Sequence, residues 1–305
     1  MTTVQTSDLP PLVEQGPGSG TLVSRVQSIW QYRELLANLV QRELKVKYKD
    51  SALGLLWTLL NPLLYLAVFS IVFAVVIPSG APRFGLLLLS GLLASNLFSA
   101  GLTASASSIT GNGPLVQKVW FPREVLPLAA IGSELATFGF QLVILFGGMA
   151  VFRHSPEWSM LWLTLPAMLA LLTLIVGLGV MLAAINVYYR DVEHFLGLAL
   201  LTLFWLTPVV YPFDLVGQKL IDSWGPGAER IAMLNPVTPV VITFQRVVYN
   251  PTQFDAAGQE PFQLLMQPSS WYLQNLAVTA GFGVVMLVVG LRLFHRLQAN
   301  LGEAL

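Results

Sequence analysis

The chain changes from charged to apolar within the stretch RELKVKYKDSALGLLWTLL, residues 42–60. Before it, apolar residues recur at helical spacing from Val26 to Val40, and the intervening positions become more basic toward Lys49. A helix with this pattern lies along an anionic membrane surface with its cations near the headgroups. Residues 55–77, which follow, are apolar enough to cross a bilayer. The junction therefore predicts an amphipathic interface helix over residues 23–50 that leads into a first membrane span.

Composition places most of the chain in a membrane. Of the 305 residues, 55% are hydrophobic and only 10% are charged, and the mean hydropathy is +0.68, whereas soluble domains carry about 25% charged residues. Residues 1–22 are polar and contain Pro and Gly, so we expect a disordered cytoplasmic tail there. The absence of cysteine excludes disulfides and thiolate metal sites.

Six apolar stretches predict an all-α integral membrane protein with six transmembrane helices, formed within residues 51–305. The stretches are residues 55–77, 84–105, 125–152, 160–184, 195–211 and 271–294. The fifth is the shortest and ends at Pro208 and Pro212, which indicates irregular backbone at one of its ends.

The distribution of basic residues predicts that both termini are cytoplasmic, because basic loops remain on the inner side of a membrane. Eleven then lie inside: Arg25, Arg33, Arg42, Lys45, Lys47, Lys49, Lys118, Arg123, Arg190, Arg292 and Arg296. Five lie outside: Arg83, Arg153, Lys219, Arg230 and Arg246.

A long outer segment, residues 213–270, separates the fifth and sixth spans. Its apolar part, residues 231–249, is interrupted by Asn235, Pro236 and Arg246. This mixture is typical of short re-entrant or interfacial helices rather than of a seventh span. A seventh span would also place the C-terminal arginines outside, against the charge distribution.

The loop between the second and third spans reads TGNGPLVQKVWFPRE, residues 110–124. Its glycines end the preceding helix, and residues 115–121 have room for two helical turns before Pro122. Such a helix would expose Val116, Val119, Trp120 and Phe121 for docking into the groove of a partner. The alternative is an interfacial start to the third span, with Trp120 as an ordinary membrane-belt residue.

Aromatic residues are spaced by four along the first span, and they follow one side of the helix. Together with aromatics on the second and fifth spans they form a set suited to stacking on sugar rings, or alternatively to packing and lipid contact. The set comprises Trp57, Tyr65, Phe69, Phe73, Phe98, Phe204 and Trp205, together with the polar Asn61, which continues the spacing of four between Trp57 and Tyr65.

Few residues of this chain carry recognisable chemistry. Glu134 lies within the third span, where an acid either lines a pathway or hydrogen-bonds a neighbouring helix. The histidines, His154, His194 and His295, are dispersed and predict no metal site. No phosphate-binding Gly-x-x-x-x-Gly-Lys-Ser/Thr motif is present, so the chain does not bind ATP through that motif.

An ordered set of local patterns resembles the membrane-spanning permeases of ABC exporters for lipid-linked polysaccharides, which include O-antigen, teichoic-acid and cell-wall galactan exporters. The resemblance covers about residues 28–298. The patterns are Lys47-Tyr48-Lys49 followed by Leu53-Gly54-Leu55-Leu56-Trp57 and Asn61-Pro62; Phe121-Pro122-Arg123-Glu124 with Pro127; Asn186-Val-Tyr-Tyr-Arg-Asp191; Pro208-Val-Val-Tyr-Pro212; and Asn235-Pro236 with Gln245-Arg246. The tail and the insertion at residues 255–260 depart from this pattern.

The resemblance implies a homodimer on two copies of a separate ABC ATPase, which binds ATP and Mg, while this chain binds no cofactor or metal. Implied partners are membrane lipids and an undecaprenyl-linked polysaccharide, without nucleic acid, in the bacterial cytoplasmic membrane. The ATPase would contact a coupling helix with Leu115, Val116, Lys118, Val119, Trp120, Phe121 and Arg123. The aromatic set would line a glycan channel. Lys45, Lys47 and Arg190 would meet the lipid pyrophosphate or the ATPase, and Tyr211, Asn235, Pro236 and Arg246 would belong to an outer gate.

Two other function classes are compatible with the residues. An ABC exporter of drugs or small lipids shares the six-span plan but usually lacks the leading basic helix. An integral-membrane glycan-processing enzyme would show clustered acidic or basic residues in a large loop. The acids of residues 213–270 are scattered instead, so we expect a transport subunit rather than an enzyme.

Overall fold

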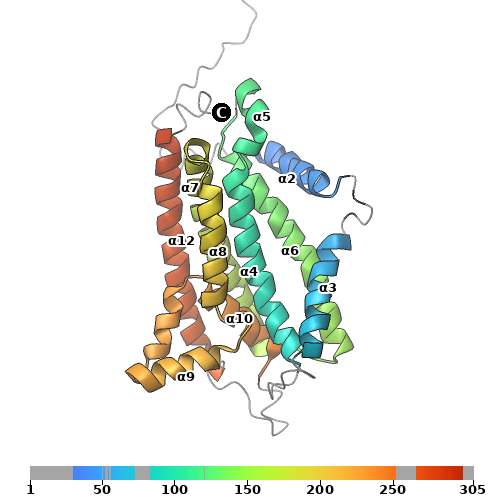
Figure 1. The fold of residues 1–305 in the computed structure, drawn as a ribbon, viewed down its shortest axis with the longest axis vertical. Helices are drawn as coiled ribbons and strands as arrows, with labels where there is room; N and C mark the ends of the chain where they lie inside the picture. The colour runs from blue at the N-terminus through green and yellow to red at the C-terminus, as the bar shows by residue number, and fades with distance from the viewer. Residues whose placement is uncertain are drawn as a thin grey trace, which may run out of the picture.

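The computed structural model describes residues 30–49, 51, 54, 56–72, 83–119, 121–251 and 266–297. These residues form helices joined by turns, without a strand among them. The bundle has two ends in Figure 1. The α5 end carries α2 and α5, and the α9 end carries α9 and α10.

Each of the six predicted spans coincides with a helix. These helices are α3 (Leu56–Ile71), α4 (Phe84–Ser107), α6 (Val125–Val151), α7 (Thr164–Tyr188), α8 (Val192–Leu206) and α12 (Ser269–Leu297). The helix α7 directly follows the 3-10 helix η4 (Trp158–Leu163).

The prediction of six membrane-spanning helices is confirmed only in part. Within the described residues, α4, α6, η4 with α7, and α12 are long and apolar enough to cross a membrane. The helices α3 and α8 are apolar but have only 16 and 15 residues. The helix α8 stops early because Thr207 adopts an extended conformation ahead of Pro208, whose ring disfavours a helical residue before it.

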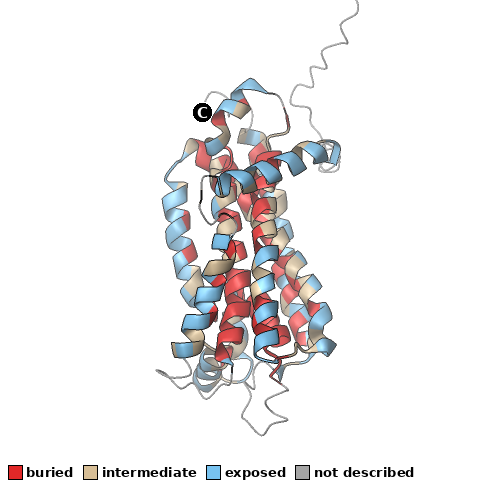
Figure 2. Cartoon of the chain, turned by 90° about the vertical axis from the view of Figure 1, so that its right-hand side faces the viewer, coloured by how far each residue is buried: buried red, intermediate tan, exposed pale blue. Residues whose placement is uncertain are grey.

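The helix α4 is the centre of the bundle. It is apolar all round and is buried on nearly every side by α3, α6, α7, α8 and α10, as expected for a helix that faces protein in all directions. Figure 1 shows α3 and α8 on either side of it, and Figure 2 shows burial concentrated along the interior helices. The remaining helices are therefore positioned by their contacts with α4 and with one another.

The helices α7 and α12 pack with their backbones in close contact. A Cβ added at Gly177 would lie 2.6 Å from the Leu287 nitrogen, and one at Gly283 would lie 2.8 Å from the Leu174 nitrogen. Small residues permit this approach, which is a common way of packing helices in membranes.

The helix α2 (Arg33–Lys47) lies across the α5 end rather than along the bundle (Figure 1). It packs on α6, with Leu39 buried and with Val40 so close to Gly132 that a Cβ there would lie 2.8 Å from the valine side chain. A helix therefore lies within residues 23–50, where the sequence predicts the interface helix, and its contact with a membrane surface stays a prediction. Residues 1–29 and 50 lie outside the described part.

The loop after α4 forms the 3-10 helix η3 (Thr110–Asn112) and the short helix α5 (Gly113–Lys118). The structure corrects the prediction of a helix over residues 115–121. The helix α5 ends at Lys118, because Val119 adopts an extended conformation. Pro114 lies in the first turn, where its missing N–H is not needed. The helix therefore begins and ends earlier than predicted.

Between α8 and α12, the described residues form three short helices. These are α9 (Phe213–Trp224), η5 (Ala228–Leu234) and α10 (Thr238–Tyr249). The axes of η5 and α10 differ by 109° across the break at Asn235 and Pro236, so short helices replace a straight span there, as the sequence predicts. Every residue of α10 is buried, whereas α9 projects sideways from the bundle (Figure 1). The insertion at residues 255–260 lies outside the described residues.

Candidate functional site

A polar cavity of about 750 Å³ opens at the α5 end. It lies between α2, the end of α4, the first half of α6 and the beginning of α8. Its charged lining residues are Arg42, Glu43, Lys47, Glu134, Arg190 and Glu193. Three cations and three acids therefore line one cavity, in a chain of which only 10% of the residues are charged.

Lys47 and Glu134 form an ion pair in this cavity. The Lys47 Nζ donates to both carboxylate oxygens of Glu134, at 2.8 and 2.9 Å. The Lys47 side chain is 39% exposed and that of Glu134 11% exposed. Of the two roles expected for Glu134, the structure therefore displays a bond to a neighbouring helix, and the partner comes from the basic helix that the sequence singled out.

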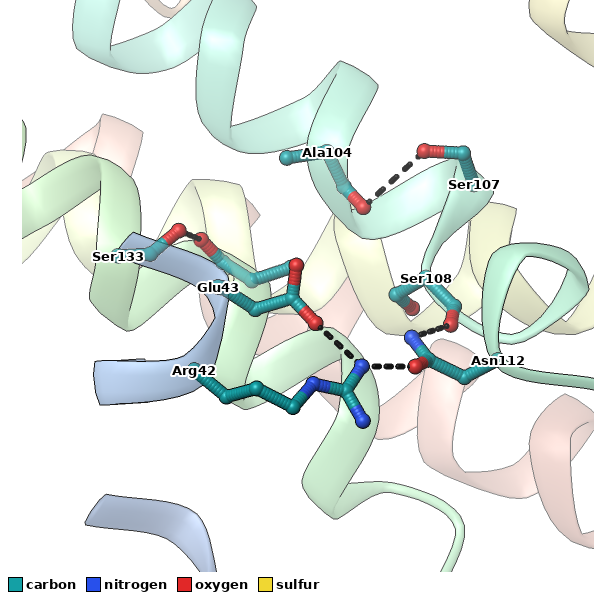
Figure 3. Close-up of polar contacts among 8 residues, drawn as sticks. Arg42, Glu43, Ala104, Ser107, Ser108, Asn112 and Ser133 are labelled. Atoms are coloured by element: carbon teal, nitrogen blue, oxygen red, sulfur yellow. Dashed lines mark hydrogen bonds and ion pairs between the residues drawn. The ribbon is translucent and has the colours of Figure 1, made fainter. Parts of the chain in front are cut away.

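Arg42 connects α2 to the loop after α4. Its Nη2 donates to Glu43 Oε1 at 2.9 Å and to the side-chain oxygen of Asn112 (Figure 3). The Asn112 amide in turn donates to the Ser108 carbonyl oxygen at 2.8 Å. One asparagine thereby links α2, the end of α4 and the start of α5. The sequence alone predicts no contact between Arg42 and Asn112, since only folding brings these distant residues together.

The opposite wall of the cavity is held by Asn186 near the end of α7. Its amide donates to the Ala106 carbonyl oxygen at 3.0 Å and to Glu193 Oε1 at 2.7 Å. Arg190 is exposed and lines the cavity, as Lys47 does. Lys45 is exposed on α2 but is not among the lining residues.

The predicted docking residues around α5 divide into two groups. Val119 is 52% exposed and Lys118 is exposed, whereas Val116 and Phe121 are each 5% exposed. The expectation that Val116 and Phe121 are exposed is therefore wrong, because both pack into an apolar cluster with Ile109, Val125 and Phe294. Leu115 and Arg123 are half-buried, and Trp120 lies outside the described residues.

The predicted aromatic set is also divided by the fold. Trp57 and Tyr65 are 48% and 44% exposed on α3, Asn61 between them is exposed, and Trp205 is 61% exposed on α8. Phe69 stacks on Tyr65 with ring centroids 6.0 Å apart, and Phe204 packs edge-on against Trp205. Phe98 is 3% exposed inside the core of the subunit, and Phe73 lies outside the described residues.

The residues assigned to a gate lie together at the α9 end. Tyr211 donates its hydroxyl to the Trp205 carbonyl oxygen at 2.8 Å. The carbonyl oxygen of Pro236 accepts from Thr279 of α12 at 3.2 Å. Asn235 hydrogen-bonds Thr207, and Arg246 is buried in an ion pair with Glu157. Polar side chains therefore join α8, η5, α10 and α12 at this end.

The model of the ABC-2 type transporter family matches residues 34–249. The chain belongs to this family. Among curated proteins, this ABC-2 transporter chain is 35% identical over 245 residues to the O-antigen export system permease protein RfbA of Myxococcus xanthus, which covers 80% of the chain and 90% of the relative. It is 26% identical over 272 residues to the protein of the same name from Klebsiella pneumoniae. That alignment covers 89% of the chain and 95% of the relative.

In this ABC-2 chain, the family match covers all the residues that line the cavity and, at the α9 end, α9, η5 and α10 but not α12. It begins at Glu34, within α2, and ends at Tyr249, the last residue of α10. The arrangement thus combines a charged cavity beside an exposed loop with a hydrogen-bonded network at the far end. Such a layout suits a transport subunit, in which the two ends of a bundle respond to different partners.

Proposed function

We propose that the chain is the permease subunit of an ATP-driven exporter that moves a lipid-linked polysaccharide across the bacterial cytoplasmic membrane. The observation that carries this proposal is the 35% identity to a permease named for O-antigen export, over 80% of this chain. The match extends over 90% of the relative, so it includes the spans and loops together rather than one shared segment. Membership of the ABC-2 family supports the same conclusion.

The α5 end would face the cytoplasm, where two permease copies would sit on two ATPase subunits. The excess of basic residues assigned to that side supports this orientation. Lys118 and Val119 are exposed beside α2 and would contact the ATPase. Val116 and Phe121 belong to an apolar cluster with Ile109, which follows α4, and with residues of α6, α7 and α12. A push on α5 would therefore reach the spans through packed side chains, since packed interiors transmit displacement.

The exposed aromatics of α3 and α8 would line the glycan path between the two copies. Trp57, Tyr65 and Trp205 present large rings away from the core of the subunit. Ring stacking on sugars does not require one hydrogen-bond pattern, so a repeating polymer could slide from one unit to the next. Phe98 is buried within the subunit and would support this wall rather than contact the polymer.

The cavity at the α5 end would receive the pyrophosphate of the lipid carrier. Lys47 and Arg190 line it, and Lys45 lies on the same helix as Lys47. A pyrophosphate would compete with Glu134 for the Lys47 ammonium, because both are anions that accept charge-assisted hydrogen bonds. Binding would then loosen the contact between α2 and α6.

The test is purification of the tagged chain in mild detergent, combined with depletion in the cell. We expect a stoichiometric ATPase to co-purify and lipid-linked polysaccharide to accumulate inside depleted cells. The pair Lys118→Glu and Val119→Asp should abolish co-purification, whereas Lys219→Glu, at an exposed position on α9, should not. Absence of any ATPase would reject the proposal. An ATPase without polysaccharide accumulation would favour the exporter of drugs or small lipids.

A further inference from the structure

Two adjacent polar residues are buried in α10, near its end. Gln245 is fully buried and Arg246 is 3% exposed. Burial of an amide or a guanidinium is unfavourable unless each finds hydrogen-bond partners. Because successive residues of a helix point about 100° apart, Gln245 and Arg246 meet different neighbours.

Arg246 binds the loop between α6 and η4. Its guanidinium forms a two-pronged ion pair with Glu157, in which Nη2 donates to Oε1 at 3.0 Å and Nη1 donates to Oε2. The backbone N–H of Glu157 donates to the Val247 carbonyl oxygen at 2.8 Å. This double contact joins the loop to α10 through both side chain and backbone, the arrangement that makes Arg–carboxylate pairs directional.

The same loop makes further contacts with the end of α10. His154 Nε2 lies 2.8 Å from the Val248 carbonyl oxygen, and the Asn250 amide donates to the Ser155 carbonyl oxygen at 3.2 Å. Arg83, immediately before α4, donates to His154 Nδ1 at 3.2 Å. The α6–η4 loop, α10 and the start of α4 are therefore joined by hydrogen bonds.

Gln245 binds a different element, the end of α8. Its Nε2 donates to the Pro208 carbonyl oxygen at 2.9 Å. Asn235, at the break between η5 and α10, donates to Thr207 Oγ1 at 2.7 Å. These bonds hold Thr207 and Pro208, at the point where α8 leaves its helical conformation.

We propose that Asn235, Gln245 and Arg246 are positioning residues that form an α10 bracket, which ties the end of α8 to the α6–η4 loop. The bracket also includes Thr207 and Glu157, the side-chain partners of Asn235 and Arg246. The end of α8 can then move only together with α10. Since Trp205 lies at that end of α8, the bracket fixes the position of this exposed aromatic residue, which is one of those proposed to line the glycan path. The consequence for export rests on the proposed function; the position of α8 does not.

The side chain of Gln245 offers a clean test. Its Oε1 is buried and has no hydrogen-bond partner within the described part of the chain. Gln245→Met keeps the volume, removes the bond to Pro208 and removes the unpaired oxygen, so the fold should be retained. Thr207→Val is a second shape-conserving variant that removes the Asn235 contact from the opposite side. Gln218→Met is the matched control, because Gln218 is exposed and bonds only Asp222 of the same helix within the described residues.

The measurement is the distance between spin labels at Leu206→Cys on α8 and Trp158→Cys on η4, in the full complex with its ATPase in lipid vesicles. The chain has no native cysteine, and both positions are exposed, at 62% and 71%. Labelled chains are mixed with excess unlabelled chains so that only distances within one subunit are read. Without ATP, Gln245→Met and Thr207→Val should each raise the population outside the resting distance about fivefold, as expected for loss of one hydrogen bond.

The outcomes separate the two proposals. Unchanged distances in both variants would overturn the bracket, as would an equal change in the Gln218→Met control. Altered distances together with less polymer exported per ATP hydrolysed would support the bracket and its role in export. Altered distances in a complex whose wild type exports no polysaccharide would support the bracket and reject the proposed function.

Discussion

Lys47 shows how the fold alters the interpretation of a single residue. In the sequence it is one of several cations on a basic helix, and Glu134 is an isolated acid in an apolar span. In the structure they neutralise each other across 87 positions of chain. An ionisable residue within a span usually finds a partner or a polar cavity, and Glu134 has both.

We expect the Lys47–Glu134 pair to couple measurably in a double-mutant cycle. Lys47→Gln and Glu134→Gln should each lower the free energy of unfolding. The loss in the double variant should be smaller than the sum of the two single losses by about 0.5–1 kcal/mol, as expected for a partly exposed pair. Denaturant titration of the purified protein measures this coupling. Lys45→Gln, on the same helix, is the control and should change stability little. Strict additivity would show that the pair contributes nothing.

His154 makes the α9 end sensitive to acid. Burial lowers the pKa of His154 below its ordinary value of 6.5, the hydrogen bond to Val248 opposes this change, and the neighbouring Arg83 guanidinium adds to it. The pKa is lower in the folded than in the unfolded chain, so the neutral form of His154 favours the folded state. This contribution to the free energy of unfolding is complete above pH 6.5 and is lost as pH falls below that value.

The expected result is a larger fall in thermal unfolding midpoint between about pH 7.5 and about pH 5.5 for the wild type than for His154→Gln. Glutamine can still donate to the Val248 carbonyl oxygen but does not titrate in this range. His194→Gln is the control, because His194 is exposed on α8, and it should leave the wild-type fall unchanged. Equal falls in the wild type and His154→Gln would contradict this account.

At the scale of elements, α5 was the hardest to predict. It is short, and the apolar residues in and after it are divided between exposed and buried surroundings, with Val119 exposed and Val116 and Phe121 buried. The pattern over residues 115–121 allowed a docking helix, but Phe121 has a better environment in the cluster beneath it. Hydrophobic burial is not directional, so an apolar residue in a loop does not reveal whether it faces a partner or its own core.

The contact between α7 and α12 yields a prediction from two glycines on the same helix. A Cβ at Gly283 would meet the backbone of α7, whereas one at Gly281 would meet nothing within 4 Å. Gly283→Ala should therefore destabilise the protein by about 1–3 kcal/mol, because backbone atoms must move apart. Gly281→Ala should be neutral or stabilising by up to about 1 kcal/mol, since alanine favours a helix. Thermal unfolding of the two variants in detergent distinguishes these outcomes, and equal effects would contradict the close packing.

At the scale of the whole molecule, the two ends have different chemistry. The α5 end holds a charged cavity beside exposed residues, and the α9 end holds polar side chains that are hydrogen-bonded to backbone carbonyls and to one another. Between them, α4 is covered on nearly every side while large aromatics of α3 and α8 remain exposed. Under the proposed function, the α5 end would be open to partners and substrate, and the bonds at the α9 end would hold that end closed.

The sequence by itself determined that the chain is helical and membrane-embedded, where its six apolar helices lie, and that a basic helix precedes them. These properties follow from local patterns of hydropathy, charge, Gly and Pro, which act over one or two helical turns. Its ordered motifs also indicated the transporter family. The break in residues 231–249 was visible for the same reason, because Asn235 and Pro236 interrupt an apolar run.

Only the tertiary structure decided which residues meet. Lys47 with Glu134, Arg42 with Asn112, Gln245 with Pro208 and Arg246 with Glu157 are all separated by dozens of positions. It also decided that Val116, Phe98 and Phe121 are buried while Trp57 and Trp205 are exposed. The physical reason is that periodicity identifies one face of a helix, whereas the neighbour of that face depends on how all the helices pack together.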